Sequence, residues 1–229
     1  MHAEAVKLAR SSDLIAPVFA GAAWLTATAL LAAPTAAIDR ETVIGGPCEE
    51  CEAVFVGMPE SIASVARIAP VDEPGIPLRV EGTVRDAAGN PVASVIVYAY
   101  HTNKSGRYPR DGSTRGTPAE RHGRLRGWAK SGADGRYVFE TIRPGGYPFS
   151  RDPEHIHMHV LEPGRCTYYI DDIVFEDDKR LTDARLRRMS RGRGGIGVTK
   201  PARDESGALA VRRDIILGEN IPDYPQRGS

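Results

Sequence analysis

An excess of charge of either sign is missing from this chain. Its 229 residues contain 30 Lys plus Arg and 30 Asp plus Glu, so the formal net charge is zero. Without a global positive field the protein has no general means of gathering nucleic acid, which argues against a polyanion binder. The Arg/Gly-rich stretch 185–195 resembles a nucleic-acid-binding segment, but acidic residues at 176–178 and 183 offset its charge. We therefore expect this stretch to form a solvated surface loop.

Aromatic residues are also few, at 7% of the chain, whereas Gly (24 residues) and Pro (17 residues) are abundant. This mixture suits short strands joined by turns better than a helical bundle. Hydrophobic residues make up 41% and charged residues 26%, which are ordinary values for a folded soluble domain. The composition therefore excludes disorder of the whole chain and a membrane protein with several spans.

A long helical period is absent, and six short segments instead show the patterns of strands. Residues 78–85 alternate apolar and polar side chains, whereas 92–100 is a nearly continuous apolar run, as expected of a strand buried on both faces. The further strand candidates are 136–142, 155–161, 168–175 and 209–217. The series predicts an all-β fold, an antiparallel β-sandwich with long loops and little helix, over residues 78–229. Residues 38–77 are a weakly patterned N-terminal extension, in which only 60–68 could make a short helix.

The first forty residues differ from the rest because their centre lacks charge. Lys7 and Arg10 precede an apolar stretch from 14 to about 33, and small residues follow it up to Ala37. Basic, apolar and then small residues is the order of a secretory signal, so residues 1–37 are predicted to direct export. The alternative is an uncleaved membrane anchor, since the stretch approaches the length needed to span a bilayer. We expect a periplasmic or extracellular protein, with membrane contact only if the leader is retained.

Cysteine is scarce, with only Cys48, Cys51 and Cys166 in the chain. The first two have Cys-x-x-Cys spacing, which serves redox pairs, half zinc sites and local disulfides. No second Cys-x-x-Cys exists to complete a four-cysteine zinc site, and the preceding residues 45–47 (Gly-Gly-Pro) indicate a loop. In an exported protein we therefore expect a structural disulfide between the two. The sequence leaves the partner of Cys166 open.

The segment His155-Ile-His-Met-His159 carries the clearest chemical signal. On a strand, side chains at i, i+2 and i+4 project from one face, so the three imidazoles lie together while Ile156 and Met158 take the other face. Alternate positions are about 6.5–7 Å apart, so two imidazoles can lean onto one metal ion at about 2 Å each. From spacing alone, metal binding competes with ordinary surface or core histidines. A His-Glu-x-x-His zinc helix is absent from the sequence.

Two tyrosines lie in Gly- and Pro-containing turns before this segment. Tyr108 follows the buried strand in Ser-Gly-Arg-Tyr-Pro, and Tyr147 precedes the histidines in Pro-Gly-Gly-Tyr-Pro. A phenolate is a hard oxygen donor that needs a strong Lewis acid, because the pKa of a phenol is normally near 10. Ferric iron is the natural candidate for such a ligand. Either tyrosine alone would be read as a packed aromatic residue in a turn.

Together these segments resemble the intradiol ring-cleavage dioxygenases, which include the catechol and protocatechuate enzymes. The matching stretch runs from about Val80 to Phe175 and comprises residues 80–92, 100–108, 134–148 and 153–157. Each segment is a weak signal by itself, but all four in this order, ending in Tyr and His-x-His, are specific. The resemblance implies a β-sandwich of the intradiol dioxygenase type.

The resemblance also implies a metal centre and a reaction. In that family two tyrosinates and two histidines hold a non-haem ferric ion, which makes the expected Fe(III) ligands Tyr108, Tyr147, His155 and His157. His159 matches no family ligand. The expected substrates are a catecholic aromatic and O2, with no organic cofactor, and cleavage between the two hydroxyl-bearing carbons gives a cis,cis-muconate-type diacid. Tyr147 matches the displaceable tyrosine, which takes a substrate proton as a base.

Two positions depart from the family's pattern. Asp152 stands three residues before the first histidine, where the family commonly has Arg, and Asp172 falls where it usually has Gln. An acid beside a dianionic substrate is unfavourable unless its side chain points away. The candidates for the missing positive charge, and hence for catalytic residues beside Tyr147, are Arg126 and Arg151. The helical dimerisation region of the catechol enzymes is absent, and the sequence leaves the oligomeric state open.

Two alternative functions stay open beside the dioxygenase. A non-catalytic β-sandwich that binds a protein or carbohydrate explains the strands, but not the paired tyrosines and histidines. A metal-binding protein or a differently acting metalloenzyme that has lost ring cleavage keeps the ligands, and Asp152 keeps this alternative open. Colour separates the first alternative from the others, because tyrosinate-to-iron charge transfer would make the pure protein burgundy.

Overall fold

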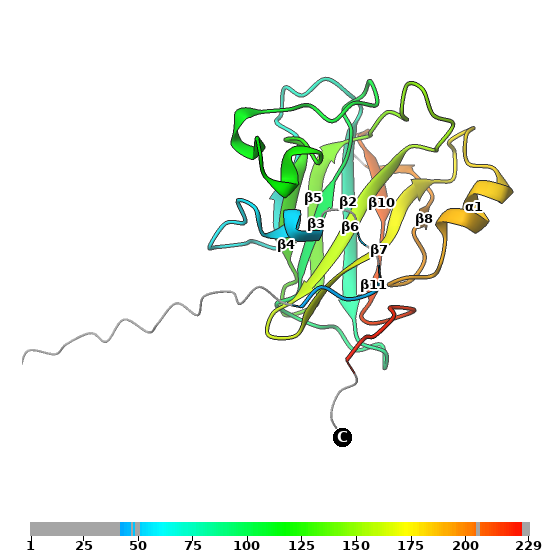
Figure 1. Cartoon of the computed structure of the whole chain (residues 1–229). Helices are drawn as coiled ribbons and strands as arrows, with labels where there is room; N and C mark the ends of the chain where they lie inside the picture. The colour runs from blue at the N-terminus through cyan, green and yellow to red at the C-terminus, as the bar shows by residue number, and fades with distance from the viewer. Residues whose placement is uncertain (1–41, 47, 49–50, 205–206, 226–229) are drawn as a thin grey trace, which may run out of the picture. The chain divides into compact units, whose positions relative to one another are not determined.

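Two β-sheets lie face to face with the main hydrophobic core between them (Figure 1). The computed structural model describes residues 42–46, 48, 51–204 and 207–225. The chain divides into two units, Met1–Thr35 and Ala36–Ser229, and every described residue belongs to the second. The predicted leader lies outside the described residues. In the part of the chain that is described, no helix combines the length and hydropathy needed to cross a membrane.

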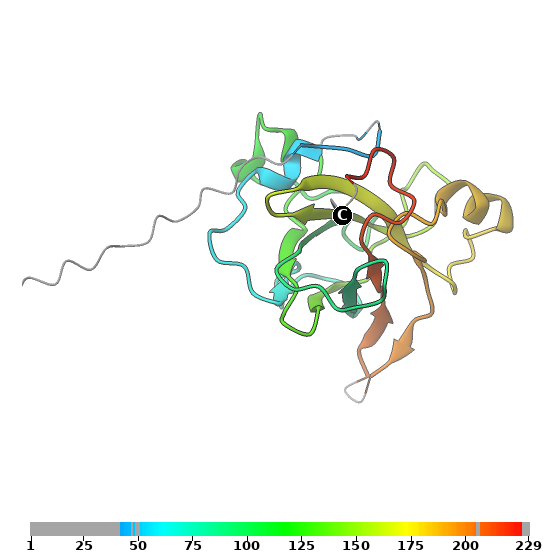
Figure 2. The same cartoon turned by 90° about the horizontal axis from the view of Figure 1, so that it is seen from below.

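The first sheet has the strand order β1-β5-β2-β10-β9, and β11 also pairs with β2. Its strands are β1 (Val65–Arg67), β2 (Pro77–Arg85), β5 (Arg136–Ile142), β9 (Ala202–Arg203), β10 (Leu209–Arg212) and β11 (Ile215–Ile216). β2 and β5 form its long antiparallel centre, whereas β1, β10 and β11 join by parallel pairing. Seen from below, the β9–β10 hairpin, coloured orange, projects from the sandwich (Figure 2).

The second sheet has the order β4-β3-β6-β7-β8 and carries the residues of chemical interest. Its strands are β3 (Ile96–Tyr100), β4 (Arg126–Lys130), β6 (His155–Glu162), β7 (Cys166–Phe175) and β8 (Val198–Thr199). β6 lies between β3 and β7 in antiparallel register. The histidine segment is therefore held by backbone hydrogen bonds on both sides, which fixes the direction of each side chain.

Little of the described chain is helical. The helices are η1 (Cys51–Phe55), η2 (Gly112–Thr114), η3 (Pro118–Glu120) and α1 (Asp183–Met189), of which the first three are 3₁₀ helices. The inward faces of both sheets supply the core, with Phe139 from β5 and Met158 from β6 among its fully buried side chains. Each such side chain contributes about 1.5–3 kcal/mol relative to exposure, so the core fixes which face of each strand turns outward.

The predicted all-β sandwich is confirmed, including strands at 78–85, 136–142, 155–161 and 168–175. The predicted helix at 60–68 is wrong, because Val65–Arg67 is strand β1. It adds to the edge of β5, where backbone pairing on a sheet outweighs the local helical preference. Strand β4 was not predicted, since its sequence Arg-Gly-Trp-Ala-Lys alternates only weakly.

The segment expected to precede the domain packs closely onto it. Val54 and Ile62 join Tyr98 and Tyr100 in a second hydrophobic cluster on the outer face of the second sheet. Trp128 Nε1 donates to the carbonyl of Val54 at 2.7 Å. Residues 51–62 therefore cover this face of the sheet and shield its outward-pointing aromatic side chains from water.

The Arg/Gly-rich stretch is only partly the solvated loop that its composition predicts. Helix α1 has no buried residue, so this part is solvated. Arg193 is buried, donates to the carbonyl of Gly45 at 2.8 Å, and its guanidinium lies over the ring of Tyr169. The expectation is therefore wrong for Arg193, which joins the N-terminal segment to β7.

Candidate metal centre

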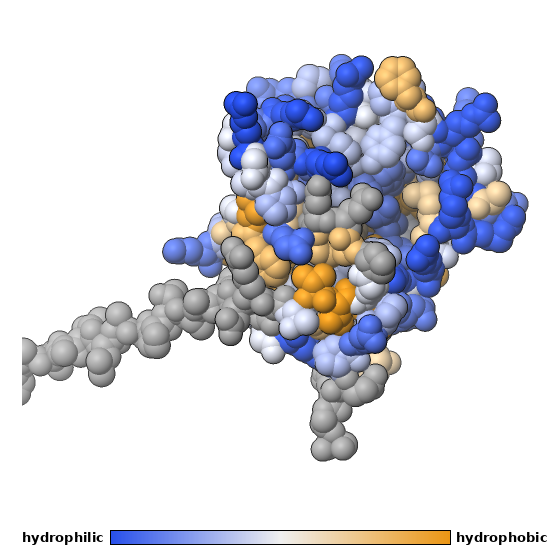
Figure 3. All heavy atoms as spheres, in the orientation of Figure 1, coloured by the Kyte–Doolittle hydropathy of each residue, from blue (hydrophilic) through white to orange (hydrophobic). Residues whose placement is uncertain are grey.

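Strand β6 presents its histidines on the face opposite the core. Ile156, Met158 and Val160 belong to the main core, so the histidines that alternate with them, at 155, 157 and 159, point outward. On that side the ring of Tyr100 stacks on His157, with ring centroids 4.5 Å apart. The alternation predicted for this segment is confirmed. Hydrophilic residues predominate over the loops at the top of the view in Figure 3, beyond the start of this strand.

A β-bulge in β7 fixes the orientation of His157. Ile170 and Ile173 are both in the core although they are three residues apart, because the register with β6 shifts between them. Two residues, Asp171 and Asp172, therefore face the single residue His157. His157 Nδ1 donates to a carboxylate oxygen of Asp172 at 3.1 Å. The bulge thus supplies the acceptor that orients this imidazole.

His155 is oriented by a backbone group. Its Nδ1 donates to the carbonyl of Pro153 at 2.7 Å. Because both Nδ1 atoms carry the proton, the Nε2 atoms of His155 and His157 both present lone pairs, and they lie 3.1 Å apart. Two lone pairs that point at each other repel. A cation bound between the two nitrogens would accept both lone pairs and remove this repulsion.

The two tyrosines come from loops that contact each other. Tyr108 lies in the loop after β3, and Tyr147 lies in the loop after β5. A Cβ atom on Gly106 would lie 2.1 Å from the carbonyl oxygen of Gly146, and Gly106 has a φ of +72°, so glycine is required there. The close approach brings the two phenol oxygens within 2.7 Å of each other.

Four donor atoms converge where these loops meet β6. Tyr147 Oη lies 3.2 Å from His155 Nε2 and 3.5 Å from His157 Nε2, and His157 Nε2 lies 3.0 Å from Tyr108 Oη. Ligands bound at about 2 Å from one metal ion are themselves about 3 Å apart. The structure thus brings together all four predicted ligands, with a spacing that fits a metal ion. Asp172 also lies close enough to ligate, but its contact with His157 Nδ1 gives it an orienting role.

A cavity of about 590 Å³ opens beside these donors. Tyr100 and His122 form an aromatic wall, with their rings stacked at 3.6 Å between centroids. The cavity is also lined by three arginines, Arg107, Arg110 and Arg121. The aromatic wall and the three arginines match a flat, electron-rich ring with anionic oxygens, and one acid, Glu120, also lines the cavity.

Burial by itself favours the neutral forms of these groups. It raises the pKa of Tyr108 well above its ordinary value, and the neighbouring phenol of Tyr147 adds to the rise. It lowers the pKa of His155 below its ordinary value, and it lowers the pKa of His122 to about 3. Neutral imidazoles are the form that binds metals. Ionisation of Tyr108 requires a strong Lewis acid, which agrees with the ferric iron expected from the sequence.

The two arginines predicted to supply positive charge are not among the residues that line the cavity. Arg126 donates to the carbonyl of Val56 at 2.8 Å, and its guanidinium lies over the ring of Trp128. Arg151 is exposed. Arg126 is thus occupied in holding residues 51–57 on the sheet, and the structure offers other arginines at the cavity.

These cavity arginines were not predicted from the sequence. Arg107 and Arg110 flank Tyr108 in one turn, which was the available signal. The acid that raised doubt, Asp152, does not line the cavity: it accepts a hydrogen bond from Ser150 Oγ at 2.6 Å and lies 3.6 Å from Arg188. Asp152 therefore does not bring its negative charge into the cavity; the acid that does line it, Glu120, lies 3.9 Å from Arg110.

Comparison with known proteins places this chain in a family. A family model described as "Dioxygenase" matches residues 54–216, well over half of the chain. The chain belongs to the intradiol dioxygenase family. The match includes all four tyrosine and histidine donors and both sheets of the sandwich. The ring-cleaving dioxygenases of this family are oxidoreductases.

Curated relatives of the dioxygenase agree in family but differ in length. The chain is 35% identical over 153 residues to the protocatechuate 3,4-dioxygenase beta chain of Burkholderia cepacia, covering 60% of this chain and 63% of the relative. It is 42% identical over 76 residues to catechol 1,2-dioxygenase 1 of Acinetobacter lwoffii, a match that covers 33% of this chain and 24% of the relative. The matches thus span less than two thirds of these relatives.

Solved structures support the fold of the dioxygenase. The wild-type catechol 1,2-dioxygenase of Acinetobacter radioresistens matches with a TM-score of 0.55 and 23% identity, over 75% of this chain and 63% of that one. A dioxygenase domain from Streptomyces sp. SirexAA-E matches with a TM-score of 0.52 and 24% identity, over 66% of this chain and 85% of that domain. At these identities the likeness establishes the sandwich alone.

Proposed function

We propose that this dioxygenase uses non-haem Fe(III) to cleave a catecholic aromatic ring between its two hydroxyl-bearing carbons. Dioxygen is the second substrate, and the product is a cis,cis-muconate-type diacid. The observation that carries the proposal is the convergence of two phenol oxygens and two imidazole nitrogens beside the cavity, each of which lies 2.7–3.5 Å from at least two of the others. Such a set suits a hard, strongly Lewis-acidic cation.

The residues present fit ferric iron. Tyr108 and Tyr147 would supply two negative charges, and His155 and His157 would supply the neutral donors, which lowers the net charge of a trivalent ion to plus one. When bound, ferric iron supplies the Lewis acidity that lets a catechol bind through both oxygens as a dianion and react with dioxygen. The protein's own contribution is to hold the donors, to bind the ring and to move protons.

The surroundings of the two tyrosines support different roles for them. Tyr108 packs against the second hydrophobic cluster, and its ring centroid lies 5.9 Å from that of Tyr100. Tyr147 lies in a loop in which Phe149, two residues further along the chain, is 98% exposed. We therefore assign Tyr108 as the retained ligand. Tyr147 leaves when a catechol binds, and its phenolate accepts one of the two substrate protons.

The cavity supports recognition of an electron-rich ring. Tyr100 and His122 offer a flat wall for stacking, and Arg107 and Arg121 offer positive charge to anionic oxygens. His155 Nδ1 donates a hydrogen bond to the carbonyl of Pro153, and His157 Nδ1 donates one to Asp172. These bonds hold both imidazoles in their orientation while substrate enters. The partners proposed are thus a small catecholic molecule and O2, without nucleic acid.

The deciding experiment is an anaerobic titration of iron-loaded protein with catechol, followed by admission of oxygen and analysis of the product. The expected sequence is a burgundy protein, a new absorption band on catechol binding, and a ring-opened diacid after oxygen enters. The His157→Ala variant, prepared in parallel, should lose the colour. A coloured protein that binds catechol without opening it would instead be a metal-binding relative, and a colourless protein would be a non-catalytic module.

A further inference from the structure

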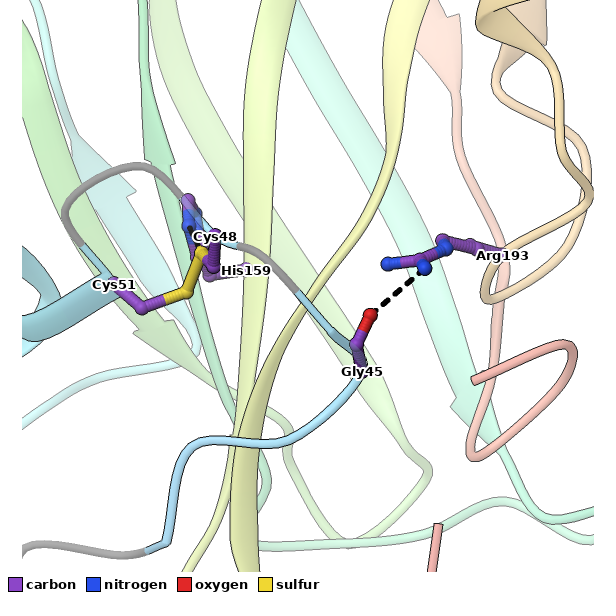
Figure 4. The surroundings of a disulfide bond; sticks show 5 residues. All are labelled: Gly45, Cys48, Cys51, His159 and Arg193. Atoms are coloured by element: carbon purple, nitrogen blue, oxygen red, sulfur yellow. Dashed lines mark hydrogen bonds between the residues drawn. A yellow bond between two sulfur atoms is a disulfide. The ribbon is translucent and has the colours of Figure 1, made fainter. Parts of the chain in front are cut away.

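The Cys-x-x-Cys pair faces a histidine that the iron centre does not use. Cys48 and Cys51 form a disulfide, as the sequence predicts for an exported protein. Cys48 Sγ lies 3.6 Å from Nε2 of His159, which is the third histidine of β6 (Figure 4). Cys51 is 1% exposed and His159 is 4% exposed, whereas Cys48 is partly exposed.

His159 is incompletely paired for a buried polar ring. Its Nδ1 is buried without a hydrogen-bond partner. Its Nε2 has the sulfur of Cys48 as its contact, and sulfur is a weak hydrogen-bond acceptor. Buried imidazoles normally have full hydrogen-bond partners, because an unpaired polar atom costs free energy. A metal ion at Nε2 would replace the weak contact with sulfur by a strong bond.

We propose that reduction of the Cys48–Cys51 disulfide creates a second metal site, for a thiophilic cation such as Zn²⁺ or Cu⁺. Its ligands are the two sulfur atoms and His159 Nε2, which all lie within 4.8 Å of one another. Cys-x-x-Cys spacing places two thiolates on one ion, and thiolate with imidazole selects these cations over hard ones. The half zinc site in the sequence is thus completed by a histidine from a distant strand.

The surroundings leave room for a further ligand. A cavity of about 240 Å³ is lined by Cys48, His159, Tyr169 and Asp172, among others. A water molecule there would complete a four-coordinate zinc ion, as in sites that keep an open position. The site shares no ligand with the candidate iron centre, because its ligands are Cys48, Cys51 and His159. It therefore exists independently of the proposed ring cleavage.

Reduction of the Cys48–Cys51 disulfide and the metal binding that follows balance in atoms and electrons when a dithiol is the reductant. The dithiol transfers two electrons and two protons to the disulfide, the S–S bond of the protein breaks, and the reductant closes into its own disulfide. Zn²⁺ then binds the two thiols and releases two protons. In the oxidised protein both sulfurs are bonded to each other, so the site is closed to metal.

The test compares full-length protein before and after reduction with a dithiol that is then removed anaerobically. Each sample is titrated with Co²⁺ and afterwards with Zn²⁺. Reduction should add one equivalent of bound Co²⁺ with a sulfur-to-cobalt charge-transfer band, which Zn²⁺ then abolishes. The tyrosine and histidine cluster contains no sulfur and cannot produce this band. A parallel titration with Cu⁺ against a chelator distinguishes the preferred ion.

Variants identify the ligands. The double variant Cys48→Ser/Cys51→Ser should lose the band, whereas Cys166→Ala, a matched removal of the other buried thiol, should keep it. His159→Gln should weaken Co²⁺ binding at least tenfold, since one ligand of three is gone. Circular dichroism checks that each variant folds, and the cysteine variant tests the site with His159 intact. Equal metal stoichiometry before and after reduction overturns the proposal, as does undiminished affinity in folded His159→Gln.

Discussion

His157 and Asp172, on neighbouring strands, face each other through a β-bulge, with Nδ1 3.1 Å from the carboxylate oxygen. The carboxylate fixes the imidazole tautomer, so that Nε2 points to the tyrosines. It also makes the imidazole a stronger donor to a metal. This contact connects the irregularity in β7 to the candidate iron centre.

Asp172→Asn should therefore weaken iron binding by about 10–100-fold, the usual effect of removing such a partner. The amide oxygen of Asn can still accept from Nδ1, but its charge is gone. Iron affinity is measured by competition with a chelator of known strength. Asp72→Asn, at an exposed position, is the matched control and should bind iron as the parent does. Equal affinity in the two variants would remove Asp172 from the site.

The two tyrosines should respond differently to loss of their hydroxyl groups. Tyr147→Phe should still bind catechol, but turnover should fall by roughly 10²–10⁴-fold because the internal base is gone. Tyr108→Phe should change the colour of the catechol complex itself, since a retained ligand is missing. Absorption follows binding and oxygen uptake follows turnover, both with iron-loaded variants. Normal turnover in Tyr147→Phe, with a dead Tyr108→Phe that binds catechol normally, would reverse the roles.

Gly106→Ala should separate the two tyrosine loops. The added methyl would meet the carbonyl of Gly146 at 2.1 Å, and the positive φ adds backbone strain. The expected loss is roughly 2–4 kcal/mol in the free energy of unfolding, together with weaker iron binding. Urea denaturation measures the first effect and chelator competition the second. Gly112→Ala, where nothing lies within 4 Å of the new Cβ, should change neither. Parental stability in Gly106→Ala would contradict the close approach of the loops.

Acid should destabilise the fold through His101. This residue is fully buried, its ring nitrogens contact Thr102 O at 2.7 Å and Thr141 Oγ1 at 2.6 Å, and burial lowers its pKa from 6.5 to about 4. Between these values the unfolded chain binds a proton that the folded chain does not. Stability is therefore present above pH 6.5 and is lost as the pH falls toward 4.

The loss assigned to His101 between pH 7 and pH 5 is about 2 kcal/mol. Urea unfolding at both pH values measures it. His101→Gln has no titrating ring, so its stability should fall less over the same interval, even if it is lower at pH 7. An identical pH dependence in the parent and the variant would show that other groups carry the effect.

The leader should be removed near Ile38, and the protein should lie outside the cytoplasm. N-terminal sequencing of protein from the native host decides this directly. Ala37→Phe should block cleavage, because the position before the cut requires a small residue, whereas Ala36→Phe at the tolerant position should not. An intact Met1 on a cytosolic species would exclude export.

Local patterns in the sequence were sufficient for the four longest strands, β2, β5, β6 and β7, and they marked the individual candidate donors. Strand periodicity depends on neighbours two residues apart, so the alternation from His155 onward places its histidines on one face before any tertiary contact is known. The continuous apolar run of β3 indicated burial on both faces for the same reason. Gly and Pro around Tyr108 and Tyr147 marked both as turn residues. The family resemblance, and not the spacing, joined these pieces into one site.

Tertiary structure decided whatever depends on contacts between distant segments. The strand at Val65–Arg67 exists because β5 offers it a partner, and no local signal reports a free sheet edge. The cavity arginines and the inward turn of Arg193 depend on how loops pack, which periodicity does not encode. Cys48 meets His159 across 111 positions of sequence. Side-chain faces follow from the local geometry of a strand, whereas the partners on those faces follow only from the folded core that brings the strands together.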